Sequence, residues 1–350
     1  MYSEADLQSA VSAGALSHEA AEAFRAHAAG MRTAPVADEE HFRLITGFND
    51  IFVTIAAVLL LVACAGIGEA IAPGVAGVLV AAAAWGLALF FTAKRRMALP
   101  SIVLLLAFVG GVAAVPINYL AETNADLGEQ TGVLIGAGIG VLAAGAAWLH
   151  WRRFMVPITV AAGAAAVAAT VIALAVSALM QGQAHPDPEP ILLPLIFVCG
   201  LGVFAYAMRW DMSDPARESR RSDVAFWLHL LAAPMIAHPL FHWLGVTGGE
   251  NIGAAAAIGV LAIYVLMGVV ALAVDRRALL VSALAYVLIA MTWLFDRFGM
   301  VELNVAVTGL VIGSALLALS AFWTPIRSAL VQHLPGGVQA RLPQGVLAAA

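Results

Sequence analysis

Charge is the scarcest property of this sequence. Only 11% of its 350 residues are charged, whereas 62% are hydrophobic. Soluble domains carry charge on about a quarter of their residues. The composition therefore excludes an ordinary soluble globular domain and indicates an integral membrane protein, with the lipid bilayer as its surroundings.

Cysteine is almost as scarce. Cys64 and Cys199 are the two cysteines, and both lie within apolar runs. We therefore expect small core residues and neither a disulfide nor a metal pair. The net charge of -5 is too small to indicate a nucleic-acid partner. No motif calls for a metal or a cofactor, and the polar residues before the first apolar run predict no cleavable signal peptide.

The N-terminal residues 1–38 predict a small soluble unit, a helical hairpin with a linker. Ser3 and Ser17 are suited to cap two short helices, and Gly14 and Gly30 are suited to end them. The apolar residues of this hairpin are too few for a stable core of its own. We therefore expect it to dock on something, and a cytoplasmic protein partner is one candidate.

Residues 39–325 are almost entirely apolar and predict an all-α membrane helix bundle. About 20 apolar residues are needed to cross a bilayer as a helix. The candidate spans, about ten in number, are Asn49–Ile67, Ala72–Thr92, Leu99–Leu120, Thr131–Leu149, Val156–Met180, Glu189–Met208, Asp223–Leu244, Ile252–Val274, Leu279–Leu294 and Met300–Trp323.

The loops between these spans alternate in charge. If the N-terminus is placed inside, every Lys and Arg except Arg297 falls on an inner segment, and the outer loops are acidic. Cytoplasmic loops of membrane proteins collect Lys and Arg. We therefore expect both termini to be cytoplasmic. A residue such as Arg217, in the longest inner loop, is expected to contact lipid headgroups or a partner.

Residues 326–350 follow the last span. Ile326 to Leu334 predict a short amphipathic helix with Arg327 and His333 on its polar side. Such a helix is typical of a segment that lies along the inner membrane surface.

Small residues recur at helical spacing in two spans. Gly132, Gly136 and Gly140 form one ridge, and Gly309 and Gly313 repeat the pattern. Ridges of this kind let a neighbouring helix approach closely. They suit packing inside the bundle, or contact between copies in a homo-oligomer.

One apolar segment, Asp223 to Gly245, is interrupted more than any other. It holds three histidines, of which His238 and His242 share a helix face near the expected outer end. The polar residues that end or begin other spans at the same level are Asn118, Glu122, Glu302 and Asn304. Together they predict a candidate solute-binding cavity that faces outward. The alternative is that these residues are polar only because helix ends at a membrane surface are generally polar.

The same segment contains Pro234 and Pro239. Each proline lacks an N–H and frees a carbonyl one turn earlier. They are candidates for a hinge, and the alternative is a static kink satisfied by neighbouring helices.

The middle of the spans lacks Asp, Glu, Lys and Arg. Ion-coupled transporters usually keep such a group at mid-depth. Their absence argues against transport. The mid-span residues that stand among the aliphatic side chains are Thr54, Trp85, Thr170, Tyr264, Tyr286 and Thr308.

The chain resembles an uncharacterised bacterial family of predicted polytopic membrane proteins with a short cytoplasmic N-terminal domain. The resemblance rests on Gly14 to Ser17 in the opening hairpin, on Phe42 to Val62, on Ser222 to Pro239 and on the Leu-Pro steps of the tail. It implies a location in the bacterial cytoplasmic membrane. It implies no activity and no catalytic residue.

Two functions fit these observations. The chain binds or passes a small solute through an outward-facing polar cavity, or it is a sensor or scaffold that docks a partner through its N-terminal hairpin. An intramembrane enzyme needs a reactive constellation, and the sequence shows none, so we predict no enzymatic activity.

Overall fold

The computed structural model describes residues 4–24, 48–122, 128–179, 189–215, 217, 219–246, 254–297, 304–339 and 342. All regular structure in these residues is helical. Lipid offers the backbone no hydrogen-bond partner, so a chain that crosses it as a bundle must pair each N–H within its own helix. The predicted all-α class is therefore confirmed.

The N-terminal residues 1–42 belong to a unit of their own with the last residues of the chain. Its first helix, α1, spans Glu4–Ser12. Gly14 has a φ of 72°, the left-handed conformation that ends a helix, and Ser17 Oγ accepts a hydrogen bond from the N–H of Ala20 at 3.1 Å. Both predicted roles are confirmed, whereas Ser3 and the linker from residue 31 to 38 lie outside the described residues.

The second unit, Arg43–Gly345, contains the membrane helices. Their bounds are α3 Phe48–Ile71, α4 Val75–Phe91, α5 Ala98–Glu122, α6 Glu129–Phe154, α7 Ile158–Leu179, α8 Glu189–Met212, α9 Arg220–Trp243, α10 Ala254–Val274, α11 Ala278–Arg297, α12 Asn304–Ala321, α13 Trp323–Gln332 and α14 Gly336–Gln339.

Each predicted span coincides with one helix from α3 to α12, but the count of about ten spans is not confirmed. Seven described helices are long and apolar enough to cross a bilayer, and the pair α12 and α13, bent by 72°, is an eighth candidate. The 17 residues of α4 give a length of about 25 Å, short of a hydrocarbon core of about 30 Å. The described apolar part of α11, Ala278–Thr292, is shorter still.

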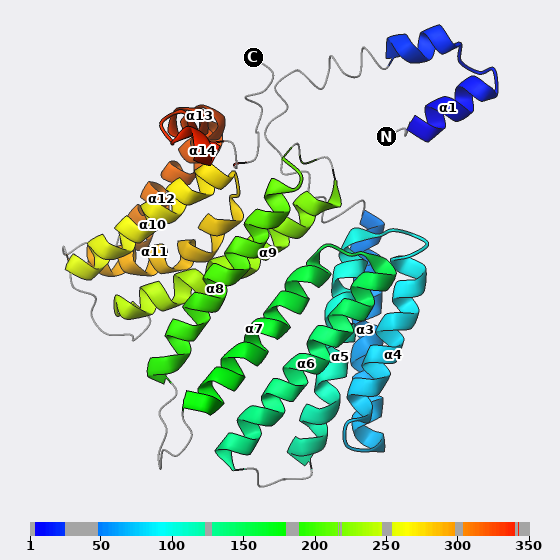
Figure 1. The fold of residues 1–350 in the computed structure, drawn as a ribbon, viewed down its shortest axis with the longest axis horizontal. Coiled ribbons are helices and arrows are strands. Elements are labelled where there is room, and N and C mark those ends of the chain that lie inside the picture. The colour runs from blue at the N-terminus through cyan, green and yellow to red at the C-terminus, as the bar shows by residue number, and fades with distance from the viewer. Residues whose placement is uncertain are drawn as a thin grey trace. The chain divides into compact units, whose positions relative to one another are not determined.

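Four helix hairpins organise the bundle (Figure 1), and their turns are the ones that the distribution of Lys and Arg predicts to be inner. The hairpins are α4/α5, α6/α7, α8/α9 and α10/α11, and their second helices pack in succession, α5 on α7, α7 on α9 and α9 on α11. In each turn one residue other than glycine takes a left-handed φ: Arg96, Met155, Arg217 or Asp275. This conformation reverses the chain directly after a helix.

Helix α9 is the interrupted segment of the sequence. It is the most buried of the seven helices long enough to span, with 50% of an 18-residue apolar stretch buried inside the bundle. It packs against α7, α8 and α11. Alanines 225, 232, 233 and 237 of α9 are all fully buried and let these neighbours approach closely.

The structure revises the predicted glycine ridges. A Cβ added at Gly132 or Gly136 would meet no atom within 4 Å, and the same holds for Gly309 and Gly313. Of the predicted positions, Gly140 does approach a neighbouring helix closely, at Thr170 on α7. Close approach that was not predicted is found between α4 and α5 at Gly77 and Gly111.

Candidate functional site

The predicted pair His238 and His242 lies on α9, and both side chains are half-buried. Their ring centroids are 6.4 Å apart. His238 Nδ1 shares a hydrogen bond of 2.7 Å with the hydroxyl of Tyr286 on α11. Tyr286 lies eight residues into α11, about 12 Å from its start, so this contact is level with the middle of the neighbouring helix and deeper than we expected.

The other predicted partners of this pair are placed elsewhere or are not described. Asn118 and Glu122 lie on α5, which packs against α3, α4, α6 and α7, whereas α9 packs against α7, α8 and α11. Glu302 lies outside the described residues, and Asn304 begins α12 but its side chain is not described. The structure therefore joins His238 to Tyr286 on α11.

The candidate hinge prolines lie inside a continuous helix. α9 runs from Arg220 to Trp243 through both Pro234 and Pro239. Pro239 is buried in the bundle and Pro234 is exposed. The helix therefore passes both prolines without a break.

A second polar site, which we did not predict, lies where the C-terminal end of α8, the N-terminal part of α9 and the α10–α11 turn meet, on the predicted inner side. Asp211, in the last turn of α8, is fully buried and accepts hydrogen bonds from two directions. His229 Nε2 lies 2.8 Å from Asp211 Oδ2, and Arg276 Nη2 donates to Asp211 Oδ1. Arg276 Nη2 also donates to the backbone oxygen and the hydroxyl of Ser222, at 3.1 and 3.0 Å.

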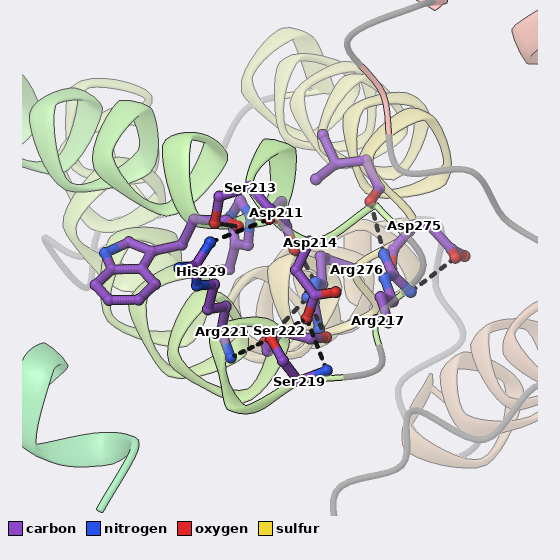
Figure 2. Close-up of polar contacts among 12 residues, drawn as sticks. Asp211, Ser213, Asp214, Arg217, Ser219, Arg221, Ser222, His229, Asp275 and Arg276 are labelled. Carbon is purple, nitrogen blue, oxygen red and sulfur yellow. Dashed lines mark hydrogen bonds and ion pairs between the residues drawn. The ribbon is translucent and has the colours of Figure 1, made fainter. Parts of the chain in front are cut away.

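Figure 2 shows these side chains converging from three segments of the chain. Asp211 comes from α8, Ser222 and His229 from α9, and Arg276 from the turn between α10 and α11. Arg276 is 2% exposed and His229 is fully buried. The nitrogen Nδ1 of His229 is also buried and has no hydrogen-bond partner among the described residues.

A neighbouring carboxylate, Asp275, forms the second half of the site. Arg217 Nη1 donates to Asp275 Oδ2 at 2.8 Å, and the indole N–H of Trp323 on α13 donates to Oδ1 at 2.8 Å. Arg327 Nε lies 3.6 Å from the same Oδ1. Arg217 also donates to the backbone oxygens of Val274 and Asp275. The interactions therefore tie the α8–α9 turn and α13 to the end of α10.

We call this group the inner ion network: Asp211, Arg217, Ser222, His229, Asp275, Arg276, Trp323 and Arg327. It corrects two expectations. Arg217 was expected to contact lipid headgroups or a partner, but it pairs with Asp275. Arg327 was expected on the polar side of an amphipathic helix, but it is 5% exposed and faces Asp275. The network joins helices that are far apart in the sequence.

The α8–α9 turn is built to hold Arg217 in place. Asp214 Oδ2 accepts hydrogen bonds from the N–H and the hydroxyl of Ser219, at 3.0 and 2.7 Å. Ser219 in turn caps α9 by accepting from the N–H of Arg221. Arg217 itself has a φ of 56°, a conformation that costs about 1 kcal/mol or more for a residue with a Cβ. The cap and the ion pairs offset that cost.

The charged groups of the network are closely paired. Asp211 and Asp275 supply two carboxylates, whereas Arg217, Arg276 and Arg327 supply three guanidinium groups. Taking a charged group out of water costs several kcal/mol unless it is paired and hydrogen-bonded. The close pairing seen here meets that requirement.

The sequence did carry a signal for this site. The inner loops are basic, yet Asp211, Asp214 and Asp275 are acidic residues on or beside them. Acids placed among inner arginines indicate pairing, whereas arginines alone fit contact with lipid headgroups. Which arginine is buried depends on how α8–α9 and α10–α11 pack, and periodicity does not define that packing.

Polar atoms continue along the same helices toward mid-depth. The hydroxyl of Tyr264 on α10 and that of Thr308 on α12 are buried and have no hydrogen-bond partner among the described residues. Tyr264 lies ten residues, about 15 Å, before the end of α10 at Val274. Buried hydroxyls without protein partners usually bind water or a ligand.

Comparisons with protein-family models, with curated proteins and with solved structures find no match to this chain. The multi-pass helical architecture makes the chain an integral membrane protein.

Proposed function

We propose that this chain is a multi-pass protein of the bacterial cytoplasmic membrane that passes a small polar solute, with the inner ion network closing the cytoplasmic end of the path. Both termini are cytoplasmic in this proposal, as the distribution of Lys and Arg indicates. The resemblance to an uncharacterised bacterial membrane family supports the location.

The observation that carries the proposal is the series of polar groups on α8, α9, α10, α11 and the α10–α11 turn. It begins with His238 and Tyr286, continues with the hydroxyl of Tyr264 and ends with His229, Asp211 and Arg276. Ionisable groups that face the interior of a membrane bundle are costly, and they commonly mark solute and ion paths. The absence of charged residues at mid-span is offset by tyrosine and histidine.

The network suits closure at the inner end because its side chains link the α8–α9 hairpin to the α10–α11 turn and link that turn to α13. Ion pairs are directional and can exchange partners with a solute or water without breaking the backbone.

The test uses purified protein and a panel of small anionic, neutral and cationic solutes. Binding is read from thermal unfolding in detergent, and passage from flux in reconstituted vesicles. We expect one class of solute in the panel to raise the Tm of the wild type and to cross the membrane. His238→Ala and His242→Ala should abolish both effects, and Arg221→Gln, an exposed arginine of the same region, should keep them. Identical responses of all four proteins to every solute would refute the proposal.

A sensor or scaffold is the second candidate, and the N-terminal unit favours it. Leu7 and Ala21 are buried within a unit that is separate from the membrane helices. Deletion of the residues before Glu39 distinguishes the two candidates. A transporter keeps its flux without them, whereas a scaffold loses its co-purifying cytoplasmic partner.

A further inference from the structure

A groove of about 580 Å³ lies between α6 and α8, with α7 behind it. Figure 1 shows α7 between these two helices. The groove follows from the hairpin arrangement. The second helices α5, α7 and α9 pack on one another, while α6 and α8 are not among the described helix pairs in extended contact. The first helices of adjacent hairpins are thus held apart over the face of α7.

The groove is long, narrow and apolar. It follows α7 from Thr159 to Val171, twelve residues or about 18 Å of helix. Small residues at positions 147, 163 and 202 leave room for a slender occupant. The lining residues Trp148 and Val167 are 61% and 53% exposed, so the groove is open along its side. All three walls are spanning helices, so this side faces the hydrocarbon of the bilayer.

The inner end of the groove is different from the rest. Trp151 and Trp210 line it, and each is the direct neighbour of an exposed arginine, Arg152 or Arg209. The guanidinium of Arg152 lies 5.3 Å from the ring centroid of Trp148, a further lining residue. Tryptophan rings with arginine at one end of an apolar cleft are typical of the level of lipid headgroups.

We propose that this groove binds one anionic phospholipid, whose acyl chain lies along α7 between α6 and α8 and whose phosphate is held by Arg152 and Arg209. The shape suits an acyl chain, because the groove follows about 18 Å of α7 and small residues line it. The charge selects an anionic headgroup, because both cations stand at the aromatic end. The inference requires only that these helices cross a bilayer, so it does not depend on the proposed transport.

The test is native mass spectrometry of the full-length protein with phosphatidylglycerol or phosphatidylcholine of identical chains. We expect the wild type to retain phosphatidylglycerol in preference. Gly202→Leu places a side chain in the groove, where a Cβ meets no atom within 4 Å, and should reduce retention of both lipids at least tenfold. Arg152→Gln should lower retention of phosphatidylglycerol alone, by roughly fivefold.

Matched controls separate the groove from general effects. Gly136→Leu adds the same side chain in open space on α6 outside the groove, and Arg95→Gln removes an arginine that lies 5.5 Å from the ring of Phe90. Both should behave like the wild type. If Gly202→Leu does not fold, Val167→Trp takes its place as the groove-filling variant, because Val167 is an exposed residue of the groove wall.

Three outcomes would overturn the inference. The first is equal retention of both lipids by the wild type. The second is unchanged retention in the groove-filling variants. The third is a loss of oligomers in Gly202→Leu with lipid retention intact, which would assign the groove to a second copy of this chain.

Discussion

Arg276 is the residue on which the inner ion network depends. Its guanidinium donates to Asp211 and to Ser222, and only 2% of the residue is exposed. A buried pair of this kind contributes little net stability compared with apolar residues of similar volume, because desolvation offsets the attraction. Removal of one partner is costly, because it leaves the other charge buried and unpaired. The network therefore specifies how the inner helix ends fit together more than how stable they are.

The effects of substituting Asp211 and Arg276 on the free energy of unfolding should therefore be strongly coupled. Arg276→Met or Asp211→Leu alone should lower the free energy of unfolding by about 3–5 kcal/mol. The double variant should be clearly more stable than the sum of the two losses predicts, because no charge is left unpaired. Denaturant titration in mixed micelles measures all three values.

The matched control is Arg221→Gln, an exposed arginine on the first turn of α9. It should change the unfolding free energy by no more than about 0.5 kcal/mol. Additive losses in the double variant would show that Asp211 and Arg276 act independently, contrary to the contacts in the structure.

At the scale of elements, the hairpin is the repeated unit. In the inner turns of α4/α5, α6/α7, α8/α9 and α10/α11, the chain reverses through a left-handed residue that is not glycine. Two of these residues, Arg217 and Asp275, also form the ion pair of the network. The left-handed turn conformation thus positions the side chains of Arg217 and Asp275, whose ion pair joins two adjacent hairpins.

The contact between α4 and α5 gives a prediction at this scale. A Cβ on Gly77 would lie 2.6 Å from the backbone oxygen of Gly111, and a Cβ on Gly111 would lie 2.8 Å from the backbone nitrogen of Ala81. Backbone atoms cannot give way as side chains do. Gly77→Ala and Gly111→Ala should therefore each lower the free energy of unfolding by about 1–3 kcal/mol.

Gly132→Ala and Gly136→Ala are the controls, because a Cβ there meets no atom within 4 Å. Their stability should be unchanged or slightly higher, since alanine favours a helix by up to about 1 kcal/mol over glycine. If these two variants are the unstable ones, the ridge expected from the sequence has a partner after all, and a homo-oligomer becomes the explanation.

At the scale of the whole molecule, hydropathy was sufficient to predict the helices but not their partners. Each predicted span coincides with a helix from α3 to α12, because an apolar run of that length has no other stable state in lipid. The boundary between the first two spans was placed too early. Gly68 lies within α3, and the turn runs from Ala72 to Gly74.

The candidate site was predicted less well, for a physical reason. Helical spacing correctly placed His238 and His242 on one helix, but the partner of His238 is Tyr286, forty-eight positions away in the chain. Contacts of this kind depend on which helices pack together, and many arrangements satisfy the same apolar pattern. The burial of Arg276 depends on packing in the same way.

The orientation of the chain is a prediction that a labelling experiment settles. Cysteines placed at the exposed positions Glu122 and Ser213 should lie on opposite sides of the membrane. In a background without Cys64 and Cys199, a membrane-impermeant maleimide should label Glu122→Cys in intact cells. It should label Ser213→Cys only after the cells are opened. The reverse pattern would place both termini outside.

The central claim is that the inner ion network closes the path at its cytoplasmic end, and accessibility of Ala225 tests it most directly. Ala225 is fully buried on α9, one turn before His229, so a cysteine there is shielded while the network is intact. In inside-out vesicles, Ala225→Cys should react slowly with an impermeant maleimide. Adding Arg276→Gln should speed labelling at least tenfold, whereas Arg221→Gln should not. Equal rates in all three proteins, with full labelling after denaturation, would contradict the account.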